Sequence, residues 1–313
     1  MRILFSACMA ACALYGQTGT LQPPSSGFVF DGSSQTLRRI QGIPGAALIG
    51  PAVQFGFPVT AVTVSPAMDS AIVLSGDGAA HVFRLTVDGP VENPISGLAG
   101  LAAPSRVVYS PSGTAAALYA TGSVQVIKGL PGAASLAATV SVPAHSKLRR
   151  PLPQTLAISD DGAYLLYAAT GPVELIGVAG DSRKLMDAIP GALAAFAPGG
   201  HDAAVLHSGT LTLFQDVIGA ATRRDVSGLT APSAVAFSRD ARTVFVASQR
   251  ARTVSVITVA TGSTASLACD CAPTTLVPMG ALFRLNEMSN DPLWLLDATL
   301  TPKLVFVPAK SGF

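Results

Sequence analysis

The chain has 313 residues, of which 49% are apolar and only 12% are charged, and its formal net charge is +2. A balance so close to zero gives no electrostatic reason to expect a nucleic-acid partner. High apolar content raises the possibility of a membrane protein, but a spanning helix needs about twenty apolar residues with few breaks. The longest charge-free stretch, between Arg39 and Asp69, is interrupted by four prolines. We therefore expect neither a nucleic-acid partner nor a membrane span.

The N-terminus has the pattern of an export signal. Arg2 supplies a positive charge, and an apolar stretch with interspersed small residues follows and ends near Gly16. We therefore expect residues 1–16 to be a signal peptide and residues 17–313 to be a single exported domain. Because Cys8 and Cys12 each follow small residues, a lipoprotein anchor is the alternative to simple secretion.

A strand-turn-strand phrase recurs along most of the remaining chain. Its turns begin at positions 45, 49, 38 and 41 residues apart, which are Ser65, Ser110, Ser159, Ala197 and Ser238. A period near forty residues carried by short strands is typical of a β-propeller, in which each repeat forms one blade. Since each blade is covered on both faces by its neighbours, its strands read as continuous apolar runs, as in residues 71–74.

Incomplete copies of the phrase lie at both ends of the chain. Residues 28–31 and 36–40 look like a second and a third strand. In the last copy, residues 283–286 replace the inner strand, 293–296 the second strand and 303–307 the third, with no fourth strand. Six copies and the N-terminal partial copy predict an all-β, seven-bladed β-propeller, closed by strands from both termini so that no sheet edge stays exposed. A six-bladed ring is the alternative.

The clearest copy consists of a turn at residues 238–240 (SRD) and two strands at 244–248 (VFVAS) and 254–257 (VSVI). The next clearest has strands at 118–120 (LYA) and 124–127 (VQVI). These segments resemble the YVTN-type (WD40/YVTN-like) β-propeller repeat of secreted and cell-surface bacterial proteins. The resemblance implies a secreted, periplasmic or cell-surface bacterial propeller and implies no particular activity.

Two cysteines lie close together in the body of the chain, Cys269 and Cys271, with Asp270 between them. Disulfides persist in exported proteins, and the Cα atoms of residues two apart can fall within the usual range of about 4.4–6.8 Å. A local disulfide is therefore the expected state. Two thiolates alone make an incomplete zinc site, and the neighbouring carboxylate disfavours the thiolate that a redox role needs.

Candidate catalytic groups are sparse. The histidines, His81, His145, His201 and His207, have no metal-ligand spacing with a catalytic precedent, and the chain contains only three glutamates. The inner strands are expected at residues 61–64, 107–109, 156–158, 194–196 and 235–237. They carry no ionisable group except the Tyr109 phenol, and only Arg284 of the last copy departs from this rule. We therefore predict no catalytic residue, no metal site and no cofactor.

Positive charge gathers in loops that share one face of a propeller, namely those between second and third strands and those between blades. We call these residues the basic rim: Lys147, Arg149, Arg150, Arg250 and Arg252. Arginine offers a planar fork for carboxylate or sulfate groups. The favoured hypothesis is a secreted, monomeric, non-catalytic scaffold that binds an unknown protein or an anionic glycan through this face. The alternatives are ordinary solvated loops, a lactonase-type hydrolase with its site in the central channel and, last, a quinoprotein-like redox subunit.

Overall fold

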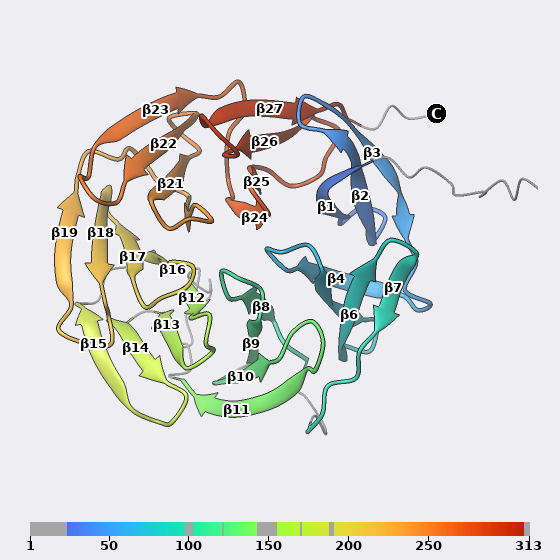
Figure 1. Ribbon diagram of the computed structural model, residues 1–313, viewed down its shortest axis with the longest axis horizontal. Coiled ribbons are helices and arrows are strands. Elements are labelled where there is room, and N and C mark those ends of the chain that lie inside the picture. The colour runs from blue at the N-terminus through green and yellow to red at the C-terminus, as the bar shows by residue number, and fades with distance from the viewer. Residues whose placement is uncertain are drawn as a thin grey trace, which may run out of the picture.

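The computed structural model describes residues 24–97, 103–120, 122–142, 155–169, 171–187 and 191–309. These residues form seven small antiparallel sheets arranged in a ring (Figure 1). The expectation of an all-β, seven-bladed β-propeller is therefore confirmed, and the six-bladed alternative is wrong. Within the described ranges no helix is present that is long and apolar enough to cross a membrane. The expected signal peptide, with Cys8 and Cys12, lies outside the described residues.

Each blade is built from one continuous stretch of chain, with successive strands running from the centre outward. Blade 1 contains β1 (Ser25–Asp31), β2 (Thr36–Ile43) and β3 (Ala46–Val53). Blade 2 contains β4 (Val59–Val64), β5 (Ser70–Ser75), β6 (Ala80–Thr86) and β7 (Gly89–Glu92). Blade 3 contains β8 (Arg106–Tyr109), β9 (Ala115–Ala120), β10 (Ser123–Lys128) and β11 (Ser135–Ser141).

The other four blades have the same four-stranded plan. Blade 4 contains β12 (Thr155–Ile158), β13 (Tyr164–Ala168), β14 (Val173–Gly177) and β15 (Ser182–Met186). Blade 5 contains β16 (Leu193–Phe196), β17 (Ala203–His207), β18 (Thr210–Gln215) and β19 (Thr222–Val226). Blade 6 contains β20 (Ala234–Phe237), β21 (Thr243–Ser248), β22 (Thr253–Thr258) and β23 (Thr264–Ala268). Blade 7 contains β24 (Val277–Met279), β25 (Leu282–Arg284), β26 (Leu293–Asp297) and β27 (Lys303–Val307).

The strand assignment predicted for the last blade is wrong by one strand. The segment expected as its inner strand lies in β25, which is the second strand, so β27 is the fourth and not the third. The true inner strand, β24, contains Pro278, which lacks a backbone N–H and therefore weakens the sequence signal of a strand. Proline is tolerated there because one edge of an inner strand faces the channel and has no neighbouring strand to bond.

The ring closes where its first and last blades meet. Strand β1 lies against β4 on one side and β24 on the other, and β3 lies against β27. We expected strands from both termini to close the ring. The first and last blades lie side by side, and no sheet within the described residues combines strands from the two ends. Residues 28–31 and 36–40, which were expected to be a second and a third strand, lie in β1 and β2, the first and second strands of blade 1, so that assignment is also wrong by one strand.

A buried serine fixes the turn between the first and second strands in four blades. Its side-chain oxygen accepts a hydrogen bond from the backbone N–H five residues further on. The pairs are Ser65 with Ser70 (3.3 Å), Ser110 with Ala115 (3.1 Å), Ser159 with Tyr164 (3.0 Å) and Ser238 with Thr243 (3.0 Å). In blade 5 the equivalent residue is Ala197, where only the backbone bond of the turn remains.

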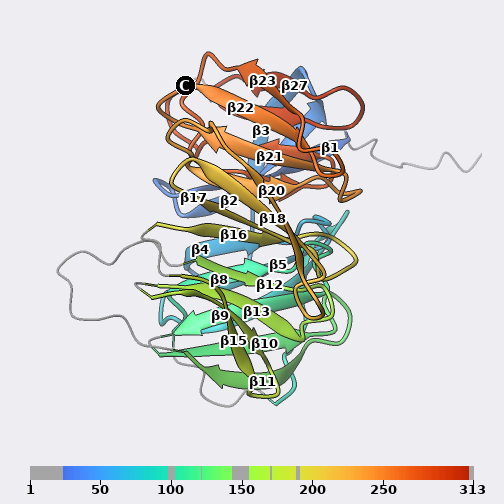
Figure 2. The same ribbon diagram turned by 90° about the vertical axis from the view of Figure 1, so that its left-hand side faces the viewer.

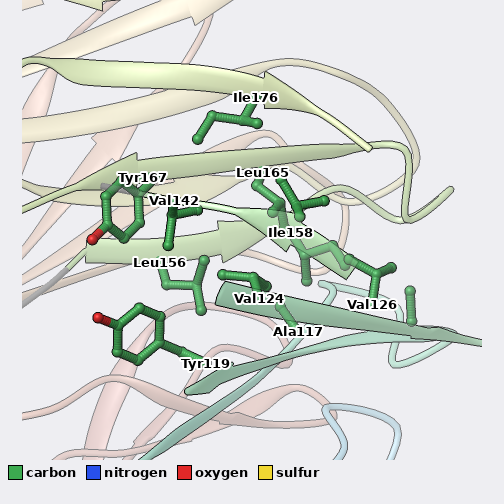
Figure 3. Packing of buried hydrophobic residues seen from close by; sticks show 12 residues of the cluster. Ala117, Tyr119, Val124, Val126, Val142, Leu156, Ile158, Leu165, Tyr167 and Ile176 are labelled. Carbon is green, nitrogen blue, oxygen red and sulfur yellow. The ribbon is translucent and has the colours of Figure 1, made fainter. Parts of the chain in front are cut away.

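The hydrophobic core lies between adjacent blades, which Figure 2 shows edge-on. Between blades 3 and 4, the fully buried Val124 and Leu165 pack with Leu156 (Figure 3). The rings of Tyr119 and Tyr167 stack in the same layer with their centroids 6.5 Å apart. Burial on both faces of a sheet accounts for the high apolar content of the chain, since each square ångström of apolar surface removed from water contributes about 25 cal/mol.

Candidate functional site

The strand order gives the ring two chemically different faces. Neighbouring strands are antiparallel, so turns between first and second strands all lie on one side, which we call the turn face. Turns between second and third strands, together with the links between blades, lie on the other side, which we call the loop face. Residues 110–114 belong to the turn face, whereas residues 249–252 and 269–276 belong to the loop face.

A central cavity of about 700 Å³ runs along the inner strands of blades 2 to 7. Its walls are largely apolar, and the larger side chains among them are Val107, Leu156, Phe196, Val235, Phe237 and Phe283. Its turn-face end is lined by Pro66, Pro111, Asp160, Pro198 and Arg239. The five segments that were expected to be inner strands lie in β4, β8, β12, β16 and β20, the first strands of their sheets, so their predicted positions are confirmed.

One cation lining this cavity was missed by the sequence analysis. Arg106 is the first residue of β8, which was expected to begin at Val107, and it lies at the loop-face end of the strand. Within the described residues its guanidinium has no hydrogen bond or ion pair. Arg106 is exposed, and partial desolvation by the adjoining cavity walls lowers its pKa from the usual value. The sequence did contain a signal for this residue. Strand ends are uncertain by one or two residues, so a basic residue directly before an apolar inner strand could have been included in the channel lining.

The other two ionisable residues considered for the channel are not available for catalysis. Tyr109 lies along the cavity, but its hydroxyl is buried without a hydrogen-bond partner, near Ser70 of blade 2, and burial raises its pKa. Arg284, which was expected on an inner strand, belongs to β25 instead. Its guanidinium donates to the Asn286 carbonyl at 3.3 Å and pairs with the Glu287 carboxylate.

Asp160 is the carboxylate of the cavity, and both its oxygens are occupied. It accepts hydrogen bonds from the backbone N–H of Ser112 at 2.6 Å and of Gly199 at 2.7 Å. Asp160 follows the end of β12, whereas Arg106 begins β8, so the two groups lie at opposite ends of the cavity. Asp160 and Arg106 therefore do not converge on one point. The other arginine of the cavity wall, Arg239, lines the same end as Asp160, but the two make no ion pair within the described residues.

The structure brings two residues of the basic rim together and does not place the others. Arg250 and Arg252 are both exposed and lie in the turn between β21 and β22. Arg252 donates to the carbonyl of Asp270 at 2.7 Å and to the carbonyl of Cys271 at 3.3 Å. Lys147, Arg149 and Arg150, together with His145, lie outside the described residues. Arg250 is thus the member of the pair whose guanidinium makes no hydrogen bond or ion pair with a described residue.

A disulfide joins Cys269 and Cys271, whose Cα atoms are 4.9 Å apart. Both cysteines are buried, and they pack against Leu276 and Phe283. The backbone N–H of Cys269 donates to the carbonyl of Arg252 at 2.8 Å, in addition to the two side-chain bonds from that arginine. The link into blade 7 is therefore held at one point by covalent, backbone and side-chain contacts.

A smaller cavity of about 270 Å³ opens on the loop face between blades 5 and 6. It is lined by the turn after β17, including His207 and Gly209, and by the link into blade 6, including Leu229 and Pro232. The His207 ring is within 3.2 Å of the Thr212 hydroxyl, which donates to the Asp225 carboxylate at 2.7 Å. The loop face over blades 5 to 7 thus combines a preformed hollow with an exposed cation.

The remaining described histidines lie within hydrogen-bond distance of carboxylates. His81 lies 2.7 Å from the Glu92 carboxylate, and His201 lies 3.0 Å from that of Asp161. Within the described ranges no group of three or more metal-ligating side chains is arranged to hold a metal ion.

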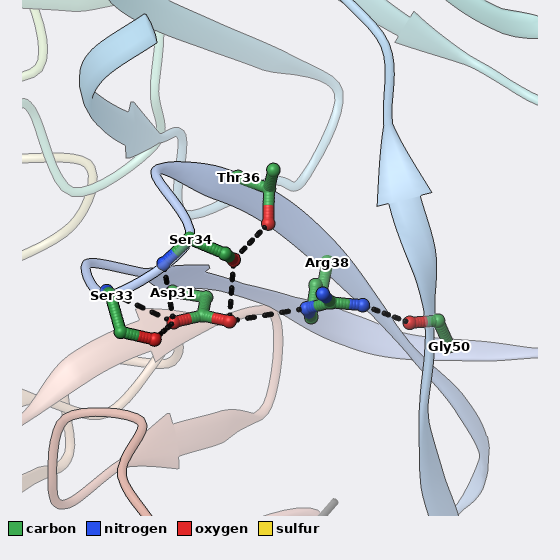
Figure 4. Close-up of polar contacts among 6 residues, drawn as sticks. All are labelled: Asp31, Ser33, Ser34, Thr36, Arg38 and Gly50. Carbon is green, nitrogen blue, oxygen red and sulfur yellow. Dashed lines mark hydrogen bonds and ion pairs between the residues drawn. The ribbon is translucent and has the colours of Figure 1, made fainter. Parts of the chain in front are cut away.

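The carboxyl group with the most strongly lowered pKa, that of Asp31, stabilises a turn and does not line either cavity. Asp31, at the end of β1, accepts hydrogen bonds from the hydroxyls of Ser33 and Ser34, each at 2.6 Å, and from both their backbone N–H groups (Figure 4). These bonds, that from the Ser33 hydroxyl first, hold its pKa far below the usual range. Arg38 donates to the same carboxylate at 3.4 Å and reaches the Gly50 carbonyl of the next strand.

No family model and no curated protein matches this sequence. Several solved structures share its fold. A functionally unknown protein from Desulfotomaculum acetoxidans is 14% identical, with a TM-score of 0.58 over 92% of this chain and 100% of that chain. Apo AztD from Citrobacter koseri is 14% identical, with a TM-score of 0.59 over 91% and 94%. A protein from Bacteroides fragilis described as a candidate 6-phosphogluconolactonase is 16% identical, with a TM-score of 0.57 over 91% and 94%.

Identities this low establish a shared β-propeller architecture and nothing about activity. The chain therefore belongs to the class of seven-bladed β-propellers. The YVTN type of its repeat stays a prediction.

Proposed function

We propose that this protein is a secreted, non-catalytic binding propeller that recognises an anionic protein or glycan through its loop face. The observation that carries the proposal is the composition of the central cavity, the usual place for a propeller active site. Its walls are largely apolar, the carboxylate that lines it, Asp160, accepts hydrogen bonds from two backbone amides, and within the described residues neither Arg106 nor Arg239 pairs with that carboxylate. Hydrolysis of a lactone or ester requires a base and an electrophilic group within reach of one substrate atom.

The loop face over blades 5 to 7 supplies the elements of a binding surface. The cavity beside His207 opens on this face between blades 5 and 6, and the exposed Arg250 lies in the turn between β21 and β22 of blade 6. Arg252 and the Cys269–Cys271 disulfide hold the adjoining link in place. Rigid loops lose little conformational entropy when a partner binds, so they favour affinity.

Charge decides the chemistry of the partner in this proposal. The guanidinium of Arg250 makes no hydrogen bond or ion pair with a described residue, and its planar fork suits carboxylate and sulfate groups of an acidic protein surface or an acidic glycan. The other members of the basic rim, Lys147, Arg149 and Arg150, lie outside the described residues. Export through the N-terminal segment would place this surface outside the cytoplasm, where such glycans and surface proteins occur.

Glycan arrays and pull-downs with the exported chain test the proposal, with binding to sulfated or uronic-acid glycans or to an acidic surface protein as the expected result. Arg250→Glu should weaken binding about tenfold or more, because one charge-assisted pair is replaced by repulsion. Arg242→Glu is the matched control, since Arg242 is an exposed arginine on the turn face. Equal losses in the two variants would indicate non-specific attraction, and turnover of a lactone or phosphoester without glycan or protein binding would overturn the proposal.

A further inference from the structure

Among the described residues, Arg106 has no counter-ion. None of the described carboxylates pairs with it, whereas other arginines such as Arg38, Arg223 and Arg284 each pair with one. The sequence adds a second constraint, because all 18 aspartates and glutamates fall within the described ranges. No acidic side chain elsewhere in the chain is therefore left to neutralise this guanidinium.

The charge of Arg106 is permanent, because a guanidinium stays protonated under all ordinary conditions. The residue is exposed at the loop-face end of the cavity, and the adjoining walls lower its pKa through partial desolvation. A fixed cation with no partner among the described residues, at the end of an apolar cavity, is therefore available to the anionic group of a ligand.

The rest of the cavity defines the other part of such a ligand. From Arg106 the inner strands run to the turn face over about 10 Å, at roughly 3.3 Å per residue, between apolar walls that include Leu156, Phe196 and Phe237. The volume of about 700 Å³ is that of a site for a small molecule. At the far end Asp160 and Arg239 oppose each other in sign, so no net charge attracts a second anionic group.

We propose that the central cavity binds a small amphipathic monoanion, a medium-chain or aromatic carboxylate, with its anionic group against Arg106 and its apolar body along the inner strands. This site is separate from the loop-face surface and does not depend on it. Arg106 lies opposite Tyr119 in the strand register, on the same side of β8 as Val108, so its side chain is presented at the junction of blades 3 and 4. An anionic group at this position would accept hydrogen bonds from the planar guanidinium of Arg106 at the end of the apolar cavity.

Isothermal titration calorimetry with decanoate, below its aggregation concentration, tests the proposal directly. We expect saturable binding of one decanoate per chain, and binding at least about tenfold weaker for decanol and decyltrimethylammonium, since they lack the charge-assisted bonds to the guanidinium. Acetate alone should not bind measurably. Naphthoate in place of decanoate distinguishes an aromatic from an aliphatic preference. Equal affinity for the cationic and anionic decyl probes, or no binding of either carboxylate, overturns the proposal.

Variants separate binding from folding. Arg106→Gln should reduce decanoate affinity about tenfold to a hundredfold, and Arg106→Lys less, because lysine keeps the charge but not the fork. Arg239→Gln, at the other end of the cavity, should have little effect, whereas Ala194→Phe should block the apolar body while Arg106 remains. Because Arg106 is exposed and its guanidinium makes no hydrogen bond or ion pair with a described residue, Arg106→Gln should leave the thermal unfolding midpoint unchanged. A lowered midpoint that Arg106→Lys restores would make Arg106 a structural residue and overturn the proposal.

The two sites can fail independently. Arg250→Glu should leave decanoate binding unchanged, and Arg106→Gln should leave binding to a loop-face partner unchanged. Loss of decanoate binding in Arg250→Glu would contradict a separate cavity site.

Discussion

The Asp160 carboxylate of blade 4 accepts a hydrogen bond from the backbone N–H of Gly199 in blade 5, at 2.7 Å. Its other oxygen accepts one from Ser112 in blade 3 at 2.6 Å, and its carbonyl accepts one from the Thr114 hydroxyl at 2.9 Å. One turn residue therefore joins three consecutive blades. The blades of the ring are separate sheets. Hydrogen bonds between them are directional, so they define the orientation of each blade relative to the next more strictly than apolar packing does.

We expect Asp160→Ala to lower the free energy of unfolding by about 2 kcal/mol, because two charge-assisted hydrogen bonds are lost at a partly exposed site. Asp160→Asn should cost about half as much, since the amide keeps one acceptor oxygen. Urea unfolding followed by circular dichroism measures both changes. Asp88→Ala is the control, because Asp88 is exposed and no hydrogen bond or ion pair joins it to another described residue. Equal effects at the two positions would contradict the role of Asp160.

The serine at the end of the inner strand should matter more than its size suggests. Ser159 is fully buried, donates to Asp161 at 2.6 Å and accepts from the Tyr164 backbone N–H at 3.0 Å. We expect Ser159→Ala to cost about 1–3 kcal/mol in the free energy of unfolding, because a backbone donor loses its partner. The reciprocal variant is Ala197→Ser in blade 5, which should be neutral or slightly stabilising. A loss in Ala197→Ser as large as that in Ser159→Ala would show that the effect is steric.

Much of the fold follows from the sequence because local chemistry and tertiary packing agree in most blades. A small buried turn residue follows each inner strand of blades 2 to 6, and a glycine or aspartate comes within a few positions. The repeats can therefore be recognised and aligned from the sequence. Blade 7 breaks this agreement. Pro278 lacks the backbone N–H of a typical strand residue, so the inner strand β24 was not recognised in the sequence. Each remaining strand of blade 7 was therefore predicted one position closer to the centre than it lies.

The candidate sites are much less predictable, since they depend on which residues the ring brings together. Arg106 was overlooked because the apolar run after it starts at Val107, and a single-residue error at a strand end removed the charge from the channel. Arg252 looked like a free cation, but its partners are backbone carbonyls of Asp270 and Cys271, which no pattern of residue types reveals. Whether a charge is paired is a property of the folded chain.

Acid should destabilise the propeller through its turn aspartates. Hydrogen bonds from Ser33, Ser75 and Ser238 hold the pKa values of Asp31, Asp77 and Asp240 below their usual value of 3.8. A carboxyl whose pKa is lower in the folded than in the unfolded state adds stability above the unfolded pKa, and that stability is lost as the pH falls through the folded pKa.

We therefore expect the free energy of unfolding to change little between neutral pH and about pH 5 on account of these groups, and to fall progressively below about pH 4. Asp31→Asn should be less stable than the unmodified protein at neutral pH and should lose less stability on acidification, because its side chain no longer titrates. Urea unfolding at a series of pH values measures both slopes. Parallel pH profiles for the two proteins would contradict the assignment to Asp31.

The Cys269–Cys271 disulfide should act locally and contribute modestly to global stability. It closes a loop of three residues, so loop-closure entropy gives about 1–2 kcal/mol at most, compared with about 5 kcal/mol for a loop of a hundred residues. Replacing both cysteines by serine should therefore lower the unfolding midpoint only slightly, while amide hydrogen exchange at residues 269–276 should become clearly faster. Arg252→Gln should accelerate exchange in the same residues, because Arg252 donates to the carbonyls of Asp270 and Cys271. Arg250→Gln is the matched control and should leave exchange unchanged. Slow exchange throughout this segment in the serine variant would contradict a local role of the disulfide, because the side-chain bonds of Arg252 and the backbone bond from residue 269 to the Arg252 carbonyl would then suffice to hold the link.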